Sequence, residues 1–310
     1  MFIAPQTLRI DRRKFLGAGA ALVAAGVLPK SVLALSGPHN FKHGNFDVTV
    51  VSDGSFEIPL EIINKEAKPE DLRALLGLAA DAKTNHMEFS PVLVKSGSDV
   101  ILFDTGNGVG NNGAGMLVES LKTAGVEPGA ITKVIYTHAH PDHLWGTLKD
   151  GKPVFANASH HVAEAEWNFW TNPDLPSKMP EAMKGMVQTT QAQLAGIKDK
   201  VAMFKPGAEV VPGINVIDTP GHTPGHVSFE LAGGDGLVLT GDAVTVPKVF
   251  FAHPDWAFGF DADGATAGKS RRALLDMAAS GKKLMLGYHW PYPGLGRAEA
   301  KDGAFVYVQA

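Results

Sequence analysis

Three histidines and one aspartate lie within six consecutive residues of this chain. They are His138, His140, Asp142 and His143, in the stretch THAHPDH at residues 137–143. Imidazole and carboxylate groups are common ligands of divalent metal ions. The chain has 12 histidines and no cysteine, which excludes thiolate ligands, cysteine nucleophiles and disulfides. The stretch therefore predicts a metal site built from nitrogen and oxygen.

The elements around this stretch are expected to bring its ligands together. An apolar strand is predicted at residues 133–136. Alternate side chains of an extended chain share a face, so His138 and His140 are expected to point to one side. Pro141 suits the first position of a helix, which places the two ligand-type residues after it in the first helical turn. The four side chains should converge where a strand turns into a helix.

Four ligands cannot complete a site for two metal ions, so other parts of the chain must supply more. Three further residues each follow an apolar segment that predicts a strand, and α/β folds commonly place their sites at such strand ends. These residues are His222 after 214–217, Asp242 after 237–240, and His289 after 283–286.

The order of these motifs resembles the metallo-β-lactamase superfamily. The pattern H-x-H-x-D-H is followed by GHTPGH at residues 221–226, by TGD at 240–242 and by a late histidine. The earlier LFDTG at residues 102–106 matches the first motif of that family. The resemblance implies an α/β fold, the four-layer αβ/βα sandwich, with a two-metal site at one edge.

The resemblance also implies a role for each residue. Asp104 and His226 are expected to support the ligands from behind rather than to bind metal. The implied ligands are His138, His140 and His222 for one ion, Asp142, His143 and His289 for the other, and Asp242 as the bridge between them.

This ligand set predicts hydrolysis. It suits zinc, with manganese, iron or cobalt as alternatives. Two ions about 3.5–4 Å apart would share a bound hydroxide that acts as the nucleophile, and Asp142 is the expected catalytic residue that orients it or moves its proton. Esters, lactones, amides and phosphotriesters are the bonds that such a site cleaves.

The absence of cysteine excludes the thiolate-dependent β-lactamases, and the carboxylate of Asp242 favours the lactonase side of the superfamily. Residues 51–54 and 292–297 look most like methyl parathion hydrolase and the N-acyl homoserine lactone lactonases. The predicted substrate is therefore a lactone of the acyl homoserine type, or a phosphotriester. An iron-dependent redox enzyme or dioxygenase on the same fold, and a β-lactamase, remain the alternatives.

A group of aromatic residues is expected to form either a hydrophobic mouth for an acyl or aryl group or ordinary core. If Phe250 and Phe251 lie on a strand, one of the two should be exposed. The glycine-rich stretch at 108–113 is interpreted as a loop beside the mouth rather than a dinucleotide site. The aromatic residues are Trp145, Phe250, Phe251, Trp256, Phe258 and Trp290.

Residues 1–35 resemble a twin-arginine export signal, with Arg12 and Arg13 ahead of an apolar run too short to span a bilayer. We therefore expect a periplasmic or secreted protein without stable membrane insertion. Cleavage near Ala34 would remove five of 28 basic and one of 32 acidic residues, which changes the net charge from −4 to −8. Such a surface argues against nucleic acid as a partner, and a homodimer is suggested only by analogy.

Strand and helix patterns alternate along residues 37–310, which predicts one hydrolase domain of α/β type. Two of the predicted elements matter below. They are a helix at 159–170, which would place His160 and His161 on the surface, and a strand at 154–156.

Overall fold

The computed structural model describes residues 36–108 and 113–310. The predicted export signal at 1–35 and most of the glycine-rich stretch lie outside the described residues. Among the helices of the described part, none has the length and apolar character needed to cross a bilayer.

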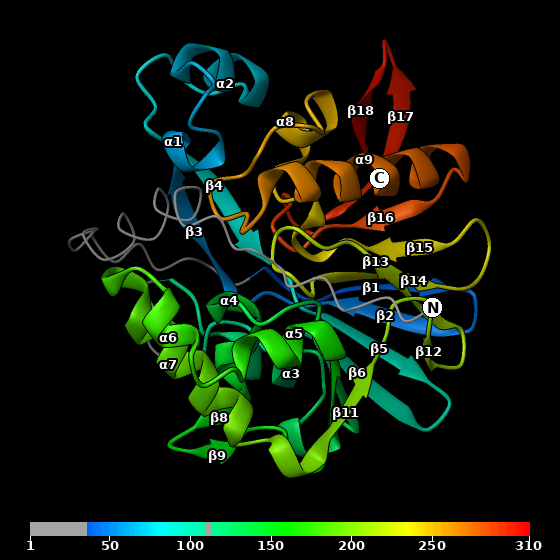
Figure 1. The fold of residues 1–310 in the computed structure, drawn as a ribbon. Helices are drawn as coiled ribbons and strands as arrows, with labels where there is room; N and C mark the ends of the chain where they lie inside the picture. Colours follow the sequence, from blue (N-terminus) through cyan, green and yellow to red (C-terminus); the bar gives the residue numbers. More distant parts are fainter. Residues whose placement is uncertain (1–35, 109–112) are drawn as a thin grey trace, which may run out of the picture.

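Two seven-stranded sheets form the centre of the fold (Figure 1). The first sheet has the order β1 (His39–His43), β2 (Phe46–Val50), β5 (Val92–Ser96), β6 (Asp99–Phe103), β7 (Lys133–Ile135), β10 (Ser159–Ala163) and β11 (Val201–Phe204). The second has the order β12 (Glu209–Val211), β13 (Ile214–Asp218), β14 (Val227–Leu231), β15 (Leu237–Leu239), β16 (Leu284–Leu286), β17 (Leu295–Lys301) and β18 (Ala304–Gln309).

The central strands are apolar on both faces, because each sheet is covered on both sides. In β5, Val92 and Val94 belong to the core between the two sheets, whereas Leu93 faces the helices outside the first sheet. Phe229 of β14 packs between Phe103 and Phe204, with ring centroids 5.1 and 5.9 Å away. Successive side chains of a strand point to opposite faces, so these runs of valine, leucine and phenylalanine fill two layers of core at once.

Helices cover the outer face of each sheet, which makes four layers and confirms the predicted αβ/βα sandwich. The helices on the first sheet include α3 (Leu117–Thr123), α5 (Glu164–Trp170) and α7 (Glu181–Ala195), with α6 (Leu175–Lys178) beside α7. Those on the second are α1 (Leu60–Ile63), α2 (Pro69–Leu76), α8 (Pro247–Ala252) and α9 (Gly264–Ser280).

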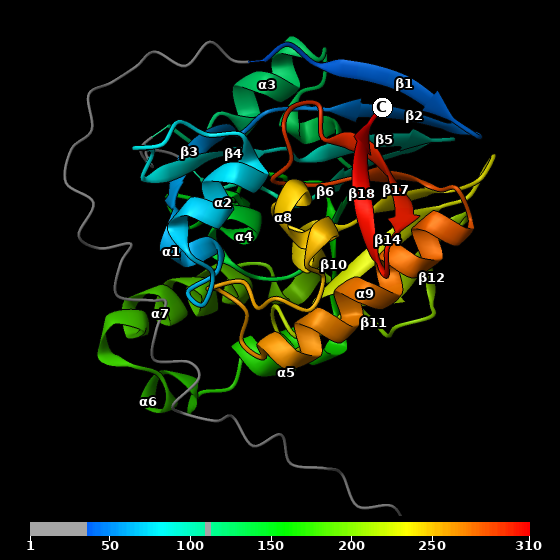
Figure 2. The same ribbon diagram turned by 90° about the horizontal axis from the view of Figure 1, so that it is seen from above.

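The predicted ligands follow strand ends that lie at one edge of the sandwich. β6 pairs with β7 and β15 pairs with β16, both in parallel, so the carboxyl ends of each pair lie together. The hairpin of β3 (Gly54–Pro59) and β4 (Thr84–Phe89) stands at this edge, beside α4 (Pro141–Leu144) (Figures 1 and 2). The smaller hairpin of β8 (Leu148–Lys149) and β9 (Lys152–Pro153) lies outside both sheets.

The prediction of one helix at 159–170 is wrong in its first half. Residues Ser159–Ala163 form β10, which pairs in parallel with both β7 and β11. Its place between two strands overrides the local helical pattern. His160 is consequently buried rather than on the surface, and its Nδ1 lies 3.0 Å from the hydroxyl of Tyr136.

Two further predictions about apolar residues are also wrong. Residues 154–156 form bends and a turn after β9 instead of a strand. Phe250 and Phe251 lie in α8 rather than on a strand, and both are fully buried. Neighbouring residues on a helix that is packed on several sides can both face the core. With Trp290, they are core of the second sheet, not part of a substrate mouth.

We predict that Phe229→Ala lowers the free energy of unfolding by about 3–5 kcal/mol, because it opens a cavity between the two sheets. Met203→Ala is the control, since this side chain is 54% exposed and its loss should change stability by less than about 0.5 kcal/mol. Urea unfolding of the metal-free protein measures both values. Similar losses in the two variants would contradict the packing between the sheets.

Candidate metal centre

The structure brings all seven predicted ligands to one edge of the sandwich, where they form two groups. Within each group the ligand atoms lie within 4.8 Å of one another. The first group is His138, His140 and His222, and the second is Asp142, His143, Asp242 and His289. As metal ligands they remain a prediction, which the geometry below supports.

In the first group, three ring nitrogens face a common space. His140 Nδ1 lies 2.9 Å from His222 Nε2. His138 Nε2 is buried and has no hydrogen-bond partner. An unpartnered buried nitrogen is costly, and a shared cation would remove that cost.

In the second group, Asp142 and two imidazoles converge. Asp142 Oδ2 lies 3.3 Å from His143 Nε2 and 3.2 Å from His289 Nε2. His143 Nε2 is buried without a hydrogen-bond partner. This second set of nitrogen and carboxylate donors again suits a divalent ion such as zinc.

Asp242 lies between the two groups. Its Oδ2 is 3.2 Å from His222 Nε2 and 3.2 Å from His289 Nε2, and its Oδ1 is 3.3 Å from His143 Nε2. One carboxylate thus reaches rings of both groups, as a bridging ligand must. The residues present therefore fit two divalent ions that share Asp242.

Four of the five imidazoles are fixed through the ring nitrogen that points away from the centre. Such a bond on Nδ1 leaves Nε2 free to face the metal. The Nδ1 partners are Thr137 Oγ1 for His138 at 3.0 Å, Asp104 Oδ2 for His143 at 2.8 Å, Asp261 Oδ1 for His222 at 3.0 Å, and the Glu88 carbonyl for His289 at 2.9 Å.

Asp104 occupies the supporting position that the sequence predicted. It follows β6 directly and has a φ of 62°, a left-handed conformation that aspartate tolerates better than most residues. Its Oδ1 accepts the backbone N–H of Thr137 at 2.8 Å, while its Oδ2 lies at His143. The carboxylate therefore ties the end of β6 to the histidine stretch.

His226 lies close to the centre but belongs to neither group. Its Nε2 accepts the backbone N–H of Asp242 at 2.9 Å, so that nitrogen has no lone pair for a metal. Its Nδ1 lies 3.1 Å from the carbonyl of Thr219. His226 thus joins the loop that carries His222 to the turn that carries Asp242.

Sequence reasoning missed Glu166, which joins the two histidine loops. Its Oε1 accepts the backbone N–H of Ala139 at 2.8 Å, and its Oε2 accepts the Thr223 hydroxyl at 2.7 Å and the Gly225 N–H at 3.0 Å. A Cβ on Gly225 would come within 2.1 Å of the Glu166 nitrogen, so only glycine allows this approach. The GHTPGH motif contains this glycine, but nothing in the helical pattern around Glu166 indicates that its carboxylate reaches the histidine loops.

Aromatic rings from outside the predicted mouth also line the centre. Tyr288 packs on His143 with a centroid distance of 4.0 Å and donates its hydroxyl to the Asp142 carbonyl at 2.6 Å. Phe56 and Phe89 of the β3–β4 hairpin pack against His289. These contacts exclude water from the rear of the second group.

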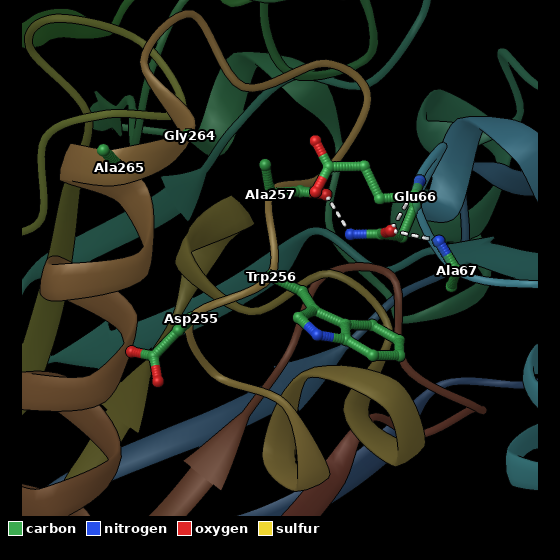
Figure 3. A pocket seen from close by; sticks show the side chains of 8 residues that line it. Glu66, Ala67, Asp255, Trp256, Ala257, Gly264 and Ala265 are labelled. Atoms are coloured by element: carbon green, nitrogen blue, oxygen red, sulfur yellow. Dashed lines mark hydrogen bonds between the residues drawn. The ribbon is translucent and has the colours of Figure 1, made fainter.

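Of the aromatic residues expected to form either a mouth or ordinary core, Phe258 contacts a predicted ligand, stacking on His222 with a centroid distance of 6.1 Å. Trp256 instead lines a cavity of about 400 Å³ that contains none of the seven ligands (Figure 3). The cavity lies among the segment Asn64–Ala67, the segment Asp255–Ala257 and the start of α9.

Burial and mutual charge shift the pKa of the ligands in opposite directions. Burial lowers the pKa of His138 well below its ordinary value and that of His140 to about 3. Burial also opposes charge on His222 and His289, but adjacent carboxylates outweigh it and raise the pKa of both to about 9. The pKa of Asp242 is well below its ordinary value, because His289 and His143 outweigh its burial.

The chain is similar to a known protein family and to several known proteins. The model of the metallo-beta-lactamase superfamily matches residues 90–289, well over half of the chain. An N-acyl homoserine lactonase of Bacillus sp is 30% identical over 157 residues, which are 50% of this chain and 55% of that protein. The chain thus spans about half the length of the curated relatives it matches.

Two solved structures are similar over most of their length. AidC, a dizinc quorum-quenching lactonase in complex with a product, N-hexnoyl-L-homoserine, is 29% identical with a TM-score of 0.83. The hydrolase AbOPH, in the beta lactamase superfamily, is 27% identical with a TM-score of 0.82. Each match covers 89% of this chain and 98% of the other.

We predict that zinc binding releases protons and strengthens as the pH rises. His222 and His289 have a pKa of about 9 in the metal-free protein, whereas a ligand must be neutral, so zinc competes with protons below that pH. The same raised pKa values stabilise the metal-free fold fully below pH 6.5, and this stability is lost as the pH rises through about 9. Chelator competition between about pH 6 and pH 9 measures the affinity. An affinity that does not change with pH would contradict the charged state of these rings.

Proposed function

The chain belongs to the metallo-β-lactamase superfamily, and on this premise we propose that it is a metal-dependent hydrolase that opens lactones of the N-acyl homoserine type. The relatives named as lactonases support the substrate class. We further propose zinc as the metal, since AidC is described as a dizinc enzyme and the donors here are nitrogen and oxygen.

The observation that carries this proposal is the position of Asp242 between the two groups of ligands. Its carboxylate lies 3.2 Å from both His222 and His289, so both ions would be held close enough to act on one bond. Two such ions supply an activated water and polarise the carbonyl of the ester. The chain then needs no serine or cysteine nucleophile.

Asp142 is proposed as the residue that handles the proton. Its side chain is 21% exposed, whereas those of His143, Asp242 and His289 are at most 4% exposed. A substrate arriving from solvent can therefore reach Asp142 before the other ligands of its group. Hydrolysis of a lactone requires one proton to move to the alkoxide that leaves the carbonyl carbon, and the position of Asp142 suits that transfer.

We also propose that the chain is exported by the twin-arginine route to the periplasm or beyond, on the strength of residues 1–35 alone. Export should fail when Arg12 and Arg13 are both replaced by lysine, because the receptor that recognises such signals reads the paired arginines. Fractionation of cells that express either form measures this. An equal amount of both forms outside the cytoplasm would contradict the proposal.

The proposed activity predicts a clear order of substrates for the zinc-loaded enzyme. Acyl homoserine lactones should be cleaved with the highest kcat/KM, ahead of aryl phosphotriesters and cephalosporins assayed side by side. A preference for phosphotriesters would shift the assignment toward the methyl parathion hydrolase type, and a preference for cephalosporins toward a β-lactamase. Activity that requires ferrous iron and oxygen would indicate the redox alternative.

We predict that Asp242→Ala reduces kcat/KM for the lactone by at least about 100-fold and weakens the binding of at least one ion, because both groups lose their shared ligand. Asp235→Asn, a change on the distant turn before β15, serves as the control. Metal content after dialysis and lactone hydrolysis are the two measurements. Unchanged turnover in Asp242→Ala would exclude the bridge.

A further inference from the structure

The segment 258–262 fixes the ring of His222 on the side that faces away from the other predicted ligands. Phe258 stacks on the ring, and Asp261 Oδ1 lies 3.0 Å from its Nδ1. The backbone N–H of Ala262 bonds to the carbonyl of His222 at 3.0 Å. The segment therefore fixes the ring, its outer nitrogen and its backbone together.

The other oxygen of Asp261 is occupied by two donors. Oδ2 accepts the backbone N–H of Phe258 at 2.8 Å and Nη2 of Arg271 at 3.3 Å. The side chains of Asp261 and Arg271 are both fully buried. A buried carboxylate is tolerated only when it is paired and hydrogen-bonded, and Arg271 supplies the ion pair for Asp261.

Arg271 also reaches the second ligand-bearing turn. Its Nε donates to the carbonyl of Ala243 at 2.8 Å, directly after Asp242. Its Nη1 donates to the carbonyls of Pro254 and Trp256, at 2.9 and 2.6 Å. The latter belongs to the wall of the cavity in Figure 3. One guanidinium from α9 thus connects the turn at Asp242 to the carboxylate behind His222.

We propose that Asp261, held by Arg271, is a positioning residue that sets which nitrogen of His222 carries the proton. By accepting Nδ1–H, it leaves the lone pair of Nε2 directed at His138 and His140, where the first ion would bind. This inference rests on the two-metal centre of the proposed function and adds a residue that decides the affinity of one of its two sites.

The two hydrogen bonds to Asp261 Oδ2 fix the orientation that an asparagine side chain would take at this position. The position of Oδ2 faces two donors, so the amide of asparagine must place its oxygen there and its NH₂ toward His222. Nδ1 of His222 must then accept, and the proton moves to Nε2, where it blocks the metal. Asp261→Ser removes the carboxylate but offers a hydroxyl that can donate or accept. Asp261→Asn, whose side chain has nearly the same shape as aspartate, should therefore weaken zinc binding more than Asp261→Ser does.

A neighbouring ion pair supplies the matched control. Asp255 pairs with Arg272, the next residue of α9, through bonds of 3.0 and 2.5 Å, and its side chain is 66% exposed. Asp255→Asn makes the same chemical change six positions earlier in the chain and does not touch His222. Its zinc affinities should equal those of the wild type.

The experiment measures zinc by chelator competition. In the metal-free protein above about pH 9, where the wild-type His222 ring is neutral, it also locates the ring proton by ¹⁵N NMR of the imidazole nitrogens. In D261N we expect one of the two zinc sites to weaken by about 10- to 100-fold, the other to keep its affinity, and His222 to show Nε2–H. In D261S the loss at that site should be smaller. A purely structural role predicts the reverse order, with asparagine as the milder change.

Two results would overturn the inference. One is D261N binding two zinc ions like the wild type, and the other is a larger loss in D261S than in D261N. If D261N does not fold, D261S decides alone, since wild-type affinity at both sites would exclude the role. Wild-type protein that binds no zinc would refute the proposed function together with this inference, whereas a zinc-binding wild type beside an unaffected variant refutes this inference only.

Discussion

Five imidazole rings and two carboxylates are held against one another in a buried space, and the surrounding structure serves that arrangement. Removing such groups from water costs several kcal/mol for each one that is charged. Hydrogen bonds to the outer nitrogens offset part of this cost. The inner atoms face one another in two groups that could each hold a cation. His138 Nε2 and His143 Nε2 are buried without a hydrogen-bond partner, as expected of nitrogens that would face a metal ion.

The outer nitrogens are held by partners from separate parts of the fold. Asp104 comes from the end of β6, Glu88 from the β3–β4 hairpin, and Asp261 from the segment before α9. Glu166 from α5 secures the backbone of both histidine loops. A site supported from such separate elements has little freedom to relax, and that rigidity keeps ligands in place before a metal arrives.

Local sequence patterns predicted which seven side chains would meet at the edge of the sandwich, because metal binding requires particular side chains at particular spacings. His138, His140 and His143 could be placed on a strand-to-helix corner from alternation and one proline. Errors arose where the environment of a segment outweighed its own pattern. Residues 159–163 form a strand because β7 and β11 lie on either side, and Phe250 is buried because α8 packs between other elements. The local sequence of these segments does not reveal the elements that pack against them.

The sequence by itself determined the chemistry of the ligands, their order along the chain and their place after strand ends, because those depend on residue type and short-range geometry. Only the tertiary structure decided that Glu166, Asp261 and Arg271 stand behind them. A supporting carboxylate needs no special spacing, since any acidic residue that the fold brings within hydrogen-bonding distance can do the work. Arg271 lies 49 positions beyond His222 in the chain, and the packing of α9 alone brings the two into one network.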